Sequence, residues 1–138
     1  MIVKVQLDSN AYIPVREHTD DAGADLRTPK RFILHPGEFK VIDTGVHIQT
    51  PCGYAWFVKS KSGLMTKKGI LTDGLVDAGY SGSVHVCLFN HSRQNHIFEA
   101  GDKIAQIVLM KVETPYFKAV DEIDSGERGN NGFGSTGR

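Results

Sequence analysis

The chain has 138 residues, of which 40% are hydrophobic and 23% charged, with 16 Lys plus Arg against 16 Asp plus Glu. This length and composition predict one folded domain and exclude a disordered, collagen-like or coiled-coil chain. A net charge of zero without a run of basic residues argues against nucleic acid or an anionic membrane as the main partner. The first seven residues lack a signal-peptide pattern, and two isolated cysteines, Cys52 and Cys87, suit a reducing compartment, so we expect a cytoplasmic protein.

Apolar residues recur with a period of two along most of the chain, which predicts β-strands. The alternating segments are, in chain order, 2–7, 32–34, 41–48, 54–58, 84–88 and 104–109. Turn residues separate these segments at the short intervals typical of a β-sandwich or barrel. Only residues 62–68, which follow a candidate Ser cap, predict a helix, and a short one. The predicted fold class is therefore all-β with one short helix.

The C-terminal segment differs in composition from the rest. Residues 121–138 (DEIDSGERGNNGFGSTGR) contain five glycines and few apolar side chains, so we expect a mobile arm after a core formed by residues 1–120. By composition the arm is a frayed terminus, yet its Gly, Ser, Thr and Arg128 offer phosphate donors and Phe133 offers a flat face for a base. Residues 132–137 match the dinucleotide pattern GxGxxG, but no helix is expected to follow them, which excludes a Rossmann site.

Two polar segments are candidates for phosphate or metal chemistry. Residues 20–27 (DDAGADLR) form either a polar turn or a carboxylate site for hydrated Mg²⁺. Residues 59–64 (KSKSGL) lead into the predicted helix, where free N–H groups and a lysine form either a phosphate site or an ordinary cap with solvated lysines.

Residues 74–82 (GLVDAGYSG) predict a tight hairpin that carries a carboxylate and an aromatic ring. Asp77 is there a candidate general base, and Tyr80 a ring that packs against a sugar. By contrast, Asp102 and Gln106 fit ordinary turn and strand positions. A metal site at His85, Cys87 and His91 is disfavoured because the spacing matches no standard zinc site.

Five segments in order resemble the five motifs of the trimeric dUTP pyrophosphatases (dUTPases). They are residues 21–27 (DAGADLR), 61–64 (KSGL), 74–82 (GLVDAGYSG), 101–106 (GDKIAQ) and 128–137 (RGNNGFGSTG). The resemblance spans nearly the whole chain. It implies a distorted β jelly-roll, a homotrimer with active sites at subunit interfaces, a Mg²⁺ cofactor, and hydrolysis of dUTP to dUMP and pyrophosphate. Such a reaction limits uracil in DNA and supplies dUMP for dTMP synthesis.

The resemblance also implies roles for individual residues. Asp77 corresponds to the base that activates water for attack on the α-phosphorus, and Tyr80 to the ring under the deoxyribose that excludes a 2′-hydroxyl. Asp25 corresponds to the carboxylate that reaches the metal through water. The expected uracil-edge residues are Gly74, Leu75, Val76 and His85. The expected phosphate contacts are Lys61, Ser62, Gly63 and Gln106. The expected arm residues, which close over a neighbouring subunit's site, are Arg128, Phe133, Gly134, Ser135 and Thr136, with Phe133 covering the uracil.

The sequence departs from the family pattern at two places. Lys61 stands where Arg is common, which replaces a bidentate phosphate grip with a point charge. The segment between Gly63 and Gly74 is also shorter than in many members and lacks the usual Asn before the third motif. Two alternatives stay open: a dCTP deaminase-like enzyme, disfavoured because no Glu occurs between Glu38 and Glu99, and a nucleotide-gated regulatory protein of the same fold.

Overall fold

Antiparallel strands form nearly all of the regular structure in this protein, which we describe for residues 1–132 from a computed structural model. The strands are β1 (Val5–Leu7), β2 (Gly23–Arg27), β3 (Phe32–Leu34), β4 (Phe39–Ile48), β5 (Tyr54–Lys59), β6 (Ile70–Leu71), β7 (Asp73–Val76), β8 (Ser83–Asn90), β9 (His96–Phe98) and β10 (Lys103–Lys111). The only helix among the described residues is α1 (Ser62–Lys68). The predicted all-β class with one short helix is therefore confirmed.

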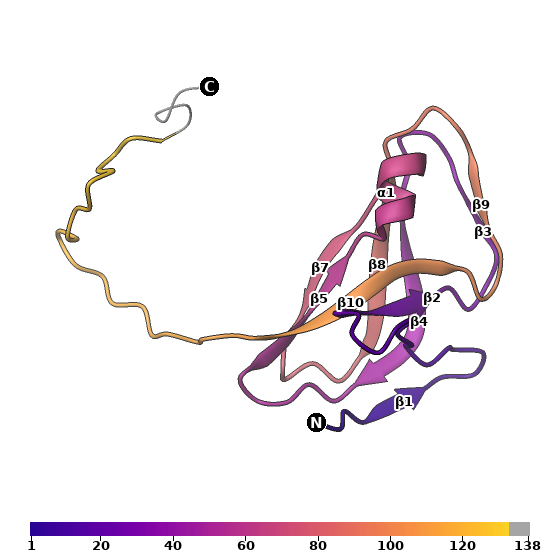
Figure 1. Cartoon of the computed structure of the whole chain (residues 1–138), viewed down its shortest axis with the longest axis horizontal. Coiled ribbons are helices and arrows are strands. Elements are labelled where there is room, and N and C mark those ends of the chain that lie inside the picture. The colour runs from indigo at the N-terminus through magenta and orange to yellow at the C-terminus, as the bar shows by residue number, and fades with distance from the viewer. Residues whose placement is uncertain (133–138) are drawn as a thin grey trace.

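Two four-stranded sheets pack face to face as a jelly-roll (Figure 1). One sheet has the order β1-β4-β8-β6 and the other β2-β10-β5-β7, while β3 and β9 form a separate pair. Alternate residues from both sheets fill the core, as the period of two predicts. Its most deeply buried side chains include Leu26, Val58, Val84, Val86, Ile104 and Ile107.

Helix α1 has the predicted bounds but not the predicted cap. The N-cap residue is Lys61, with extended φ and ψ of −75° and 131°, and no side chain caps the helix. Ser62 is already the first helical residue, so the expected Ser cap is wrong. At the other end, Gly69 adopts the left-handed conformation (φ 63°) that ends many helices, and its N–H donates to the Met65 carbonyl at 3.2 Å.

A β-bulge in β10 resolves an irregularity in the apolar pattern. Ile104 and Ile107 are three residues apart, so strict alternation would place them on opposite faces of the sheet. The pairing of β10 with β2 shifts between Lys103 and Ala105, and both isoleucines are buried. The same shift brings Lys103 and Gln106 to one side of the strand, where both line a pocket.

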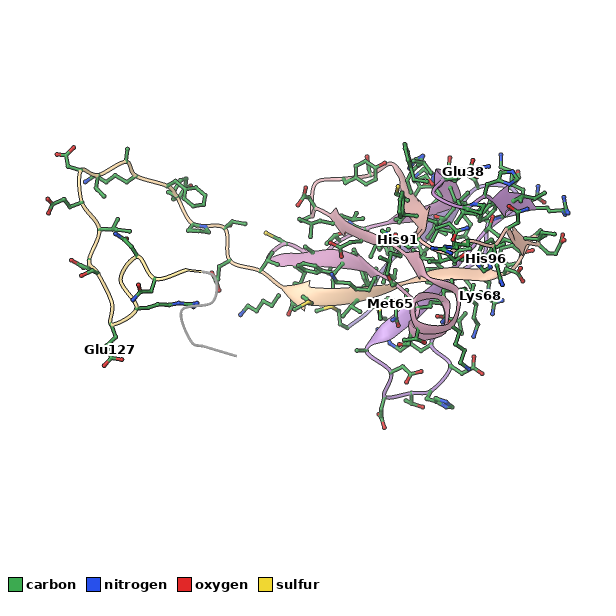
Figure 2. The ribbon with its side chains drawn as sticks, turned by 90° about the horizontal axis from the view of Figure 1, so that it is seen from above. Glu38, Met65, Lys68, His91, His96 and Glu127 are labelled. Atoms are coloured by element: carbon green, nitrogen blue, oxygen red, sulfur yellow. The ribbon has the colours of Figure 1, made fainter. Side chains whose placement is uncertain are left out.

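The chain leaves the folded core after β10. Residues 112–132 contain no strand or helix and run away from both sheets (Figure 1). Glu127 lies on this segment, well separated from the core, in Figure 2. Within residues 1–132, helix α1 is much too short to cross a membrane.

Candidate active site

A polar pocket of about 450 Å³ opens between β2, β10 and the segment that joins β5 to α1. Three lysines line it together with three carboxylates: Lys59, Lys61, Lys103, Glu17, Asp21 and Asp25. Gln106 and the backbone of Gly23 complete the lining. The sequence analysis predicted Asp25, Lys61 and Gln106 as site residues, and the fold brings these three together.

Asp25 is the buried centre of this pocket. It lies in β2, and only 7% of its surface is exposed. Its carboxylate forms ion pairs with Lys61 and, at 2.8 Å, with Lys103. Burial opposes ionisation of Asp25, but the hydrogen bonds from Lys103 and Lys61 outweigh it and lower the pKa of this carboxyl. The polar-turn interpretation of residues 20–27 is therefore wrong for residues 23–27, which form a strand with an ionised carboxylate.

Lys103 and Glu17 extend the charge network, and sequence reasoning missed both. Lys103 Nζ donates to Glu17 Oε2 at 2.8 Å as well as to Asp25, and its hydrogen bonds to these two carboxylates raise the pKa of Lys103. Lys103 lies inside the segment GDKIAQ, but simple alternation puts it on the face opposite Gln106. Lys103 lies on the same face as Gln106 only because of the bulge at Ile104. The spacing of three between the buried Ile104 and Ile107 is the sequence signal that could have indicated this bulge.

Lys59, the first residue of the candidate segment 59–64, lines the same pocket from the end of β5. Its ammonium pairs with Asp73 of β7, which lies opposite it in the sheet, and this hydrogen bond lowers the pKa of Asp73.

The first turn of α1 presents free backbone donors beside the pocket. The first N–H that bonds back within the helix is that of Met65, which donates to the Lys61 carbonyl at 2.9 Å. The N–H groups of Ser62 and Gly63 precede it and lie at exposed positions, as helix N-termini leave them. Gln106 donates through Nε2 to the Ser60 carbonyl at 3.1 Å, so it is held against the same segment.

Asp77 and Tyr80 lie on the loop 77–82 between β7 and β8. The Tyr80 hydroxyl donates to the Ser83 carbonyl at 2.9 Å, and the Tyr80 N–H donates to the Asp77 carbonyl at 3.1 Å. The flanking strands pair with β5 and with β4 and β6, in different sheets, rather than with each other. The expected tight hairpin is therefore wrong: loop 77–82 is a crossover between sheets.

The separation of β7 and β8 leaves polar backbone edges on both strands. β7 is the edge strand of its sheet and carries Gly74, Leu75 and Val76. Val76 is buried and Leu75 is exposed, so these positions offer backbone groups and one apolar side chain. His85 of β8 is exposed, with Nδ1 2.9 Å from the Ser83 carbonyl.

A single chain does not bring Asp77 and Lys61 together. Val76 pairs with Trp56 near the start of β5, whereas Lys61 follows the end of that strand at Lys59. The four residue steps from Ala55, which is level with Asp77, to Lys59 span about 13 Å. Tyr80 instead lines a second cavity, about 350 Å³ in volume, with His47 and Lys4. The predicted site is thus divided into two halves at opposite ends of one sheet.

Of the predicted arm residues, Arg128 belongs to the described part of the chain, and it lines neither cavity. Arg128 is exposed, and its Nε donates to the Asn131 carbonyl at 3.1 Å, within the arm itself. Phe133, Gly134, Ser135 and Thr136 lie outside the described residues.

A metal ion would need few protein ligands here. Within residues 1–132, no group of three or more His, Cys, Asp or Glu is arranged to hold a metal directly. His85, Cys87 and His91 are therefore not arranged as a metal site. Mg²⁺ commonly takes one or two carboxylates and completes its shell with water and substrate phosphates. The pocket carboxylates, with Asp25 at their centre, fit that indirect mode.

The dUTPase family model matches residues 9–137 of this chain. The chain belongs to the dUTPase family. It is 43% identical over 136 residues to the deoxyuridine 5'-triphosphate nucleotidohydrolase of Streptomyces avermitilis, covering 96% of this chain and 78% of that protein. It is 38% identical over 138 residues to that of Corynebacterium glutamicum, covering 97% and 93%.

Solved dUTPases share the fold. A variant of the Staphylococcus bacteriophage 80alpha dUTPase, determined with dUpNHpp, superposes with a TM-score of 0.88 at 30% identity and covers 99% of each chain. A variant of the dUTPase from phage phi11 of S. aureus, described with a structural Mg(II) ion, superposes with a TM-score of 0.82 at 29% identity and covers 88% of this chain and 98% of that one.

Proposed function

We propose that this dUTPase hydrolyses dUTP to dUMP and pyrophosphate with Asp77 as the general base. The observation that supports the proposal is that the two halves of the site, the polar pocket and loop 77–82, offer different chemical groups. The polar pocket offers lysines and backbone N–H groups suited to phosphates, whereas loop 77–82 offers a carboxylate and a ring suited to water and sugar.

The chemical step is an in-line attack on the α-phosphorus. Asp77 accepts a proton from a water molecule as its oxygen bonds to phosphorus. The bond from the α-phosphorus to the oxygen bridging to the β-phosphate breaks, and pyrophosphate leaves with that oxygen. Asp77 is exposed at the start of the loop, so an incoming water can reach it. Catalysis then rests mainly on positioning and charge neutralisation around the phosphates.

The triphosphate is assigned to the polar pocket. Lys61 and the Gln106 side chain line it, and the N–H groups of Ser62 and Gly63 follow Lys61 in the first turn of α1. Mg²⁺, when bound, neutralises phosphate charge, and Asp25 would hold it through water. Because Asp25 is already paired with Lys61 and Lys103, it also fixes the position of both ammonium groups.

The nucleoside is assigned to loop 77–82 and the edges of β7 and β8. The backbone of Gly74, Leu75 and Val76, with His85 opposite, reads the uracil edge, and Tyr80 packs under the deoxyribose. The Tyr80 ring is held by its hydroxyl on Ser83 and by Gly82, where a Cβ atom would lie 2.4 Å from the Tyr80 oxygen. We assign the exclusion of a 2′-hydroxyl to this ring.

Separation of the half-sites within one chain supports a homotrimer with active sites between subunits. The Asp77 half of one subunit then meets the Lys61 half of its neighbour. The arm, residues 121–138 beyond a core of residues 1–120, supplies Arg128, Phe133, Gly134, Ser135 and Thr136 to a neighbouring site. This arrangement accounts for the course of residues 121–132, which run away from their own core (Figure 1).

We also assign the reaction to the cytoplasm, where it limits dUTP and supplies dUMP. Cys52 and Cys87 are both free thiols, as a reducing compartment maintains them.

The dCTP deaminase alternative lacks a suitable acid. Glu38 pairs with Lys40, and Glu99 pairs with Arg31. The regulatory alternative is compatible with the same site, but no described contact favours it over hydrolysis.

Product identification tests the proposal directly. The protein is incubated with Mg²⁺ and each deoxynucleoside triphosphate, and the products are separated by ion-exchange chromatography. We expect dUMP and pyrophosphate from dUTP. Deaminated product from dCTP, or orthophosphate without pyrophosphate, would contradict the assignment.

A further inference from the structure

His47 lies where the substrate loop meets the N-terminal turn. It belongs to β4, and its ring nitrogens contact two different segments: Nδ1 is 2.9 Å from the Ser81 carbonyl of loop 77–82, and Nε2 is 3.3 Å from Asp8 Oδ1. The ring also lines the cavity next to Tyr80. No sequence motif pointed to His47.

Both partners of this ring are hydrogen-bond acceptors. A carbonyl oxygen and a carboxylate oxygen can only accept, so each ring nitrogen must carry a proton for both contacts to form. The geometry therefore selects the imidazolium form. A neutral His47 with its proton on Nδ1 would keep the bond to Ser81 and lose the one to Asp8.

A bulge in β4 creates this arrangement. Asp43 pairs with His85 and His47 with Ser83, so four residue steps on β4 face two on β8. Gly45 within the bulge has φ +66°, and a Cβ there would lie 2.9 Å from Ala11 and 3.1 Å from the Asp8 Cβ. Glycine thus lets the N-terminal turn approach, and the Asp8 N–H donates to the Gly45 carbonyl at 2.9 Å.

The bulge also secures the end of the loop from the other side. Asp43 accepts hydrogen bonds from the Ser83 hydroxyl and from the Gly45 N–H at 2.9 Å. Ser83 in turn supplies the carbonyl to which the Tyr80 hydroxyl donates. Asp43 and His47 together therefore hold the stretch of chain that follows Tyr80.

We propose that His47, in its doubly protonated form, is a positioning residue that ties loop 77–82 to Asp8 and thereby holds Tyr80 in place for the sugar. The proposal rests on the proposed function for its kinetic consequence, but not for the loop order it predicts. It adds a residue from outside the five motifs to the control of sugar selectivity.

Charged neighbours determine how this contact depends on pH. The titratable and charged groups around His47 are Asp8 and Lys4 on the β1 side, Asp43 on β4, His85 on β8, and Tyr80 in the loop. The hydrogen bond to the Ser81 carbonyl, aided by Asp8 and Asp43, raises the pKa of His47 above 6.5 despite desolvation. The contact to Asp8 is therefore complete below about pH 6.5 and is lost as the pH rises through the folded-state pKa.

The first measurement is the titration of His47 by NMR in the intact protein. Asp8→Asn removes the carboxylate while keeping the size of the side chain. We expect the pKa of His47 to fall in this variant and the other histidines to titrate as before. An unchanged pKa for His47 would overturn the proposal.

The second measurement is hydrogen exchange at the Tyr80 amide, expressed as a protection factor so that intrinsic base catalysis is removed. We expect His47→Ala to lower this protection by about two- to tenfold, as loss of one hydrogen bond does. His47→Gln keeps a donor for Ser81, so the protection of the Tyr80 amide in this variant should lie between that of the wild type and that of His47→Ala. This protection should not change between pH 6 and pH 8. His35→Ala is the matched control, because His35 also bonds an exposed polar group, Asn95, but does not contact the loop.

The third measurement is the ratio of kcat/KM for dUTP to that for UTP. We expect His47→Ala to narrow the ratio by about two- to tenfold and His35→Ala to leave it unchanged. Normal Tyr80 protection in His47→Ala would overturn the positioning role whatever the activity. Lowered protection with an unchanged ratio would overturn its link to sugar selectivity, and absence of dUTP hydrolysis by the wild type would instead contradict the proposed function.

Discussion

At Asp25, burial and charge act in opposite directions. Removing a carboxylate from water disfavours its ionised form, yet two lysines reach it from β10 and from the start of α1. The net effect is a pKa below the ordinary value. Asp25 therefore stabilises the fold while it orients the lysines that we assign to phosphate binding.

The linkage between this pKa and folding predicts how stability depends on pH. A carboxyl whose folded-state pKa is lowered stabilises the protein above its unfolded pKa, and this contribution is lost as the pH falls through the folded-state value. We expect Asp25→Asn to lower the free energy of unfolding by about 2 kcal/mol at pH 7, the size of a charged hydrogen bond. Urea unfolding of both proteins should show the difference shrinking below about pH 4. A difference that does not depend on pH would mean that ionisation of Asp25 is not its source.

Asp77 is expected to act on rate rather than on binding. Asp77→Asn preserves shape but removes the basic oxygen, so kcat should fall by about 10² to 10⁴ while dUTP still binds. Pyrophosphate release gives kcat, and calorimetry with dUpNHpp gives the affinity. Asp20→Asn makes the same change at an exposed carboxylate and should leave kcat unchanged. Near-normal turnover in Asp77→Asn would remove Asp77 from the mechanism.

Loop 77–82 carries both the proposed general base, Asp77, and the residue that we assign to sugar selectivity, Tyr80. It joins two sheets instead of closing a hairpin, so one edge of β7 stays unpaired, while β8 lies between β4 and β6 and is paired with β6 only at Phe89 and Asn90. The Tyr80 ring lies against Gly82, which has ordinary φ but no room for a side chain. Packing of a glycine therefore sets the position of the ring.

Gly82→Ala should consequently act as an indirect change to Tyr80. The added Cβ would lie 2.4 Å from the Tyr80 oxygen and 2.5 Å from Cζ, so the ring must move. We expect the ratio of kcat/KM for dUTP to that for UTP to narrow, as it should in Tyr80→Ala. Gly79→Ala is the matched control, because nothing lies within 4 Å of a Cβ built there. Equal ratios in the two glycine variants would show that the selectivity lies elsewhere.

Local pattern was sufficient to predict most elements but not the pairings between them. The period of two and the turn residues indicated the strands, and Ser62–Lys68 was the one helix. Lys61 is the N-cap because the extended backbone continues as far as this residue. Side-chain capping preferences do not predict this start of the helix. Likewise, β7 pairs with β5 rather than with β8, a long-range pairing that the residues of loop 77–82 do not show.

The site residues that belong to sequence motifs were predicted. Those that reach the site because of a β-bulge were missed. Asp25, Lys61 and Gln106 meet in one pocket as expected. Lys103 and His47 reach their partners only because β10 and β4 each contain a register shift. A bulge changes which side chains share a face, and alternation in the sequence does not show where it occurs.

At the scale of the whole molecule, one chain holds the two halves of the site and an arm whose described residues, 121–132, line neither half. Asp77 lies near the start of β5 and Lys61 beyond its end, so no local movement of a loop joins them. The arm residues 121–132 are exposed along their length and run away from the core (Figure 1). An assembly in which neighbours exchange these parts would complete every site.

Removal of the arm should therefore abolish activity without unfolding the core. Truncation after Ser125 deletes Arg128 and the residues beyond it, which are exposed up to residue 132. We expect the free energy of unfolding to stay close to that of the full chain, with loss of most dUTP hydrolysis. Circular dichroism and size-exclusion chromatography check the fold and the assembly.

Complementation between two inactive variants determines whether the base and the arm of one site come from different chains. Asp77→Asn chains have an arm but no base, and truncated chains have a base but no arm. If a site combines two chains, one half times one half of the sites in an equal mixture are whole, so refolded trimers should regain about a quarter of wild-type pyrophosphate release. If both parts come from the same chain, no site can be whole. Co-refolded mixtures that form trimers but hydrolyse dUTP no faster than the separate variants would refute the shared site.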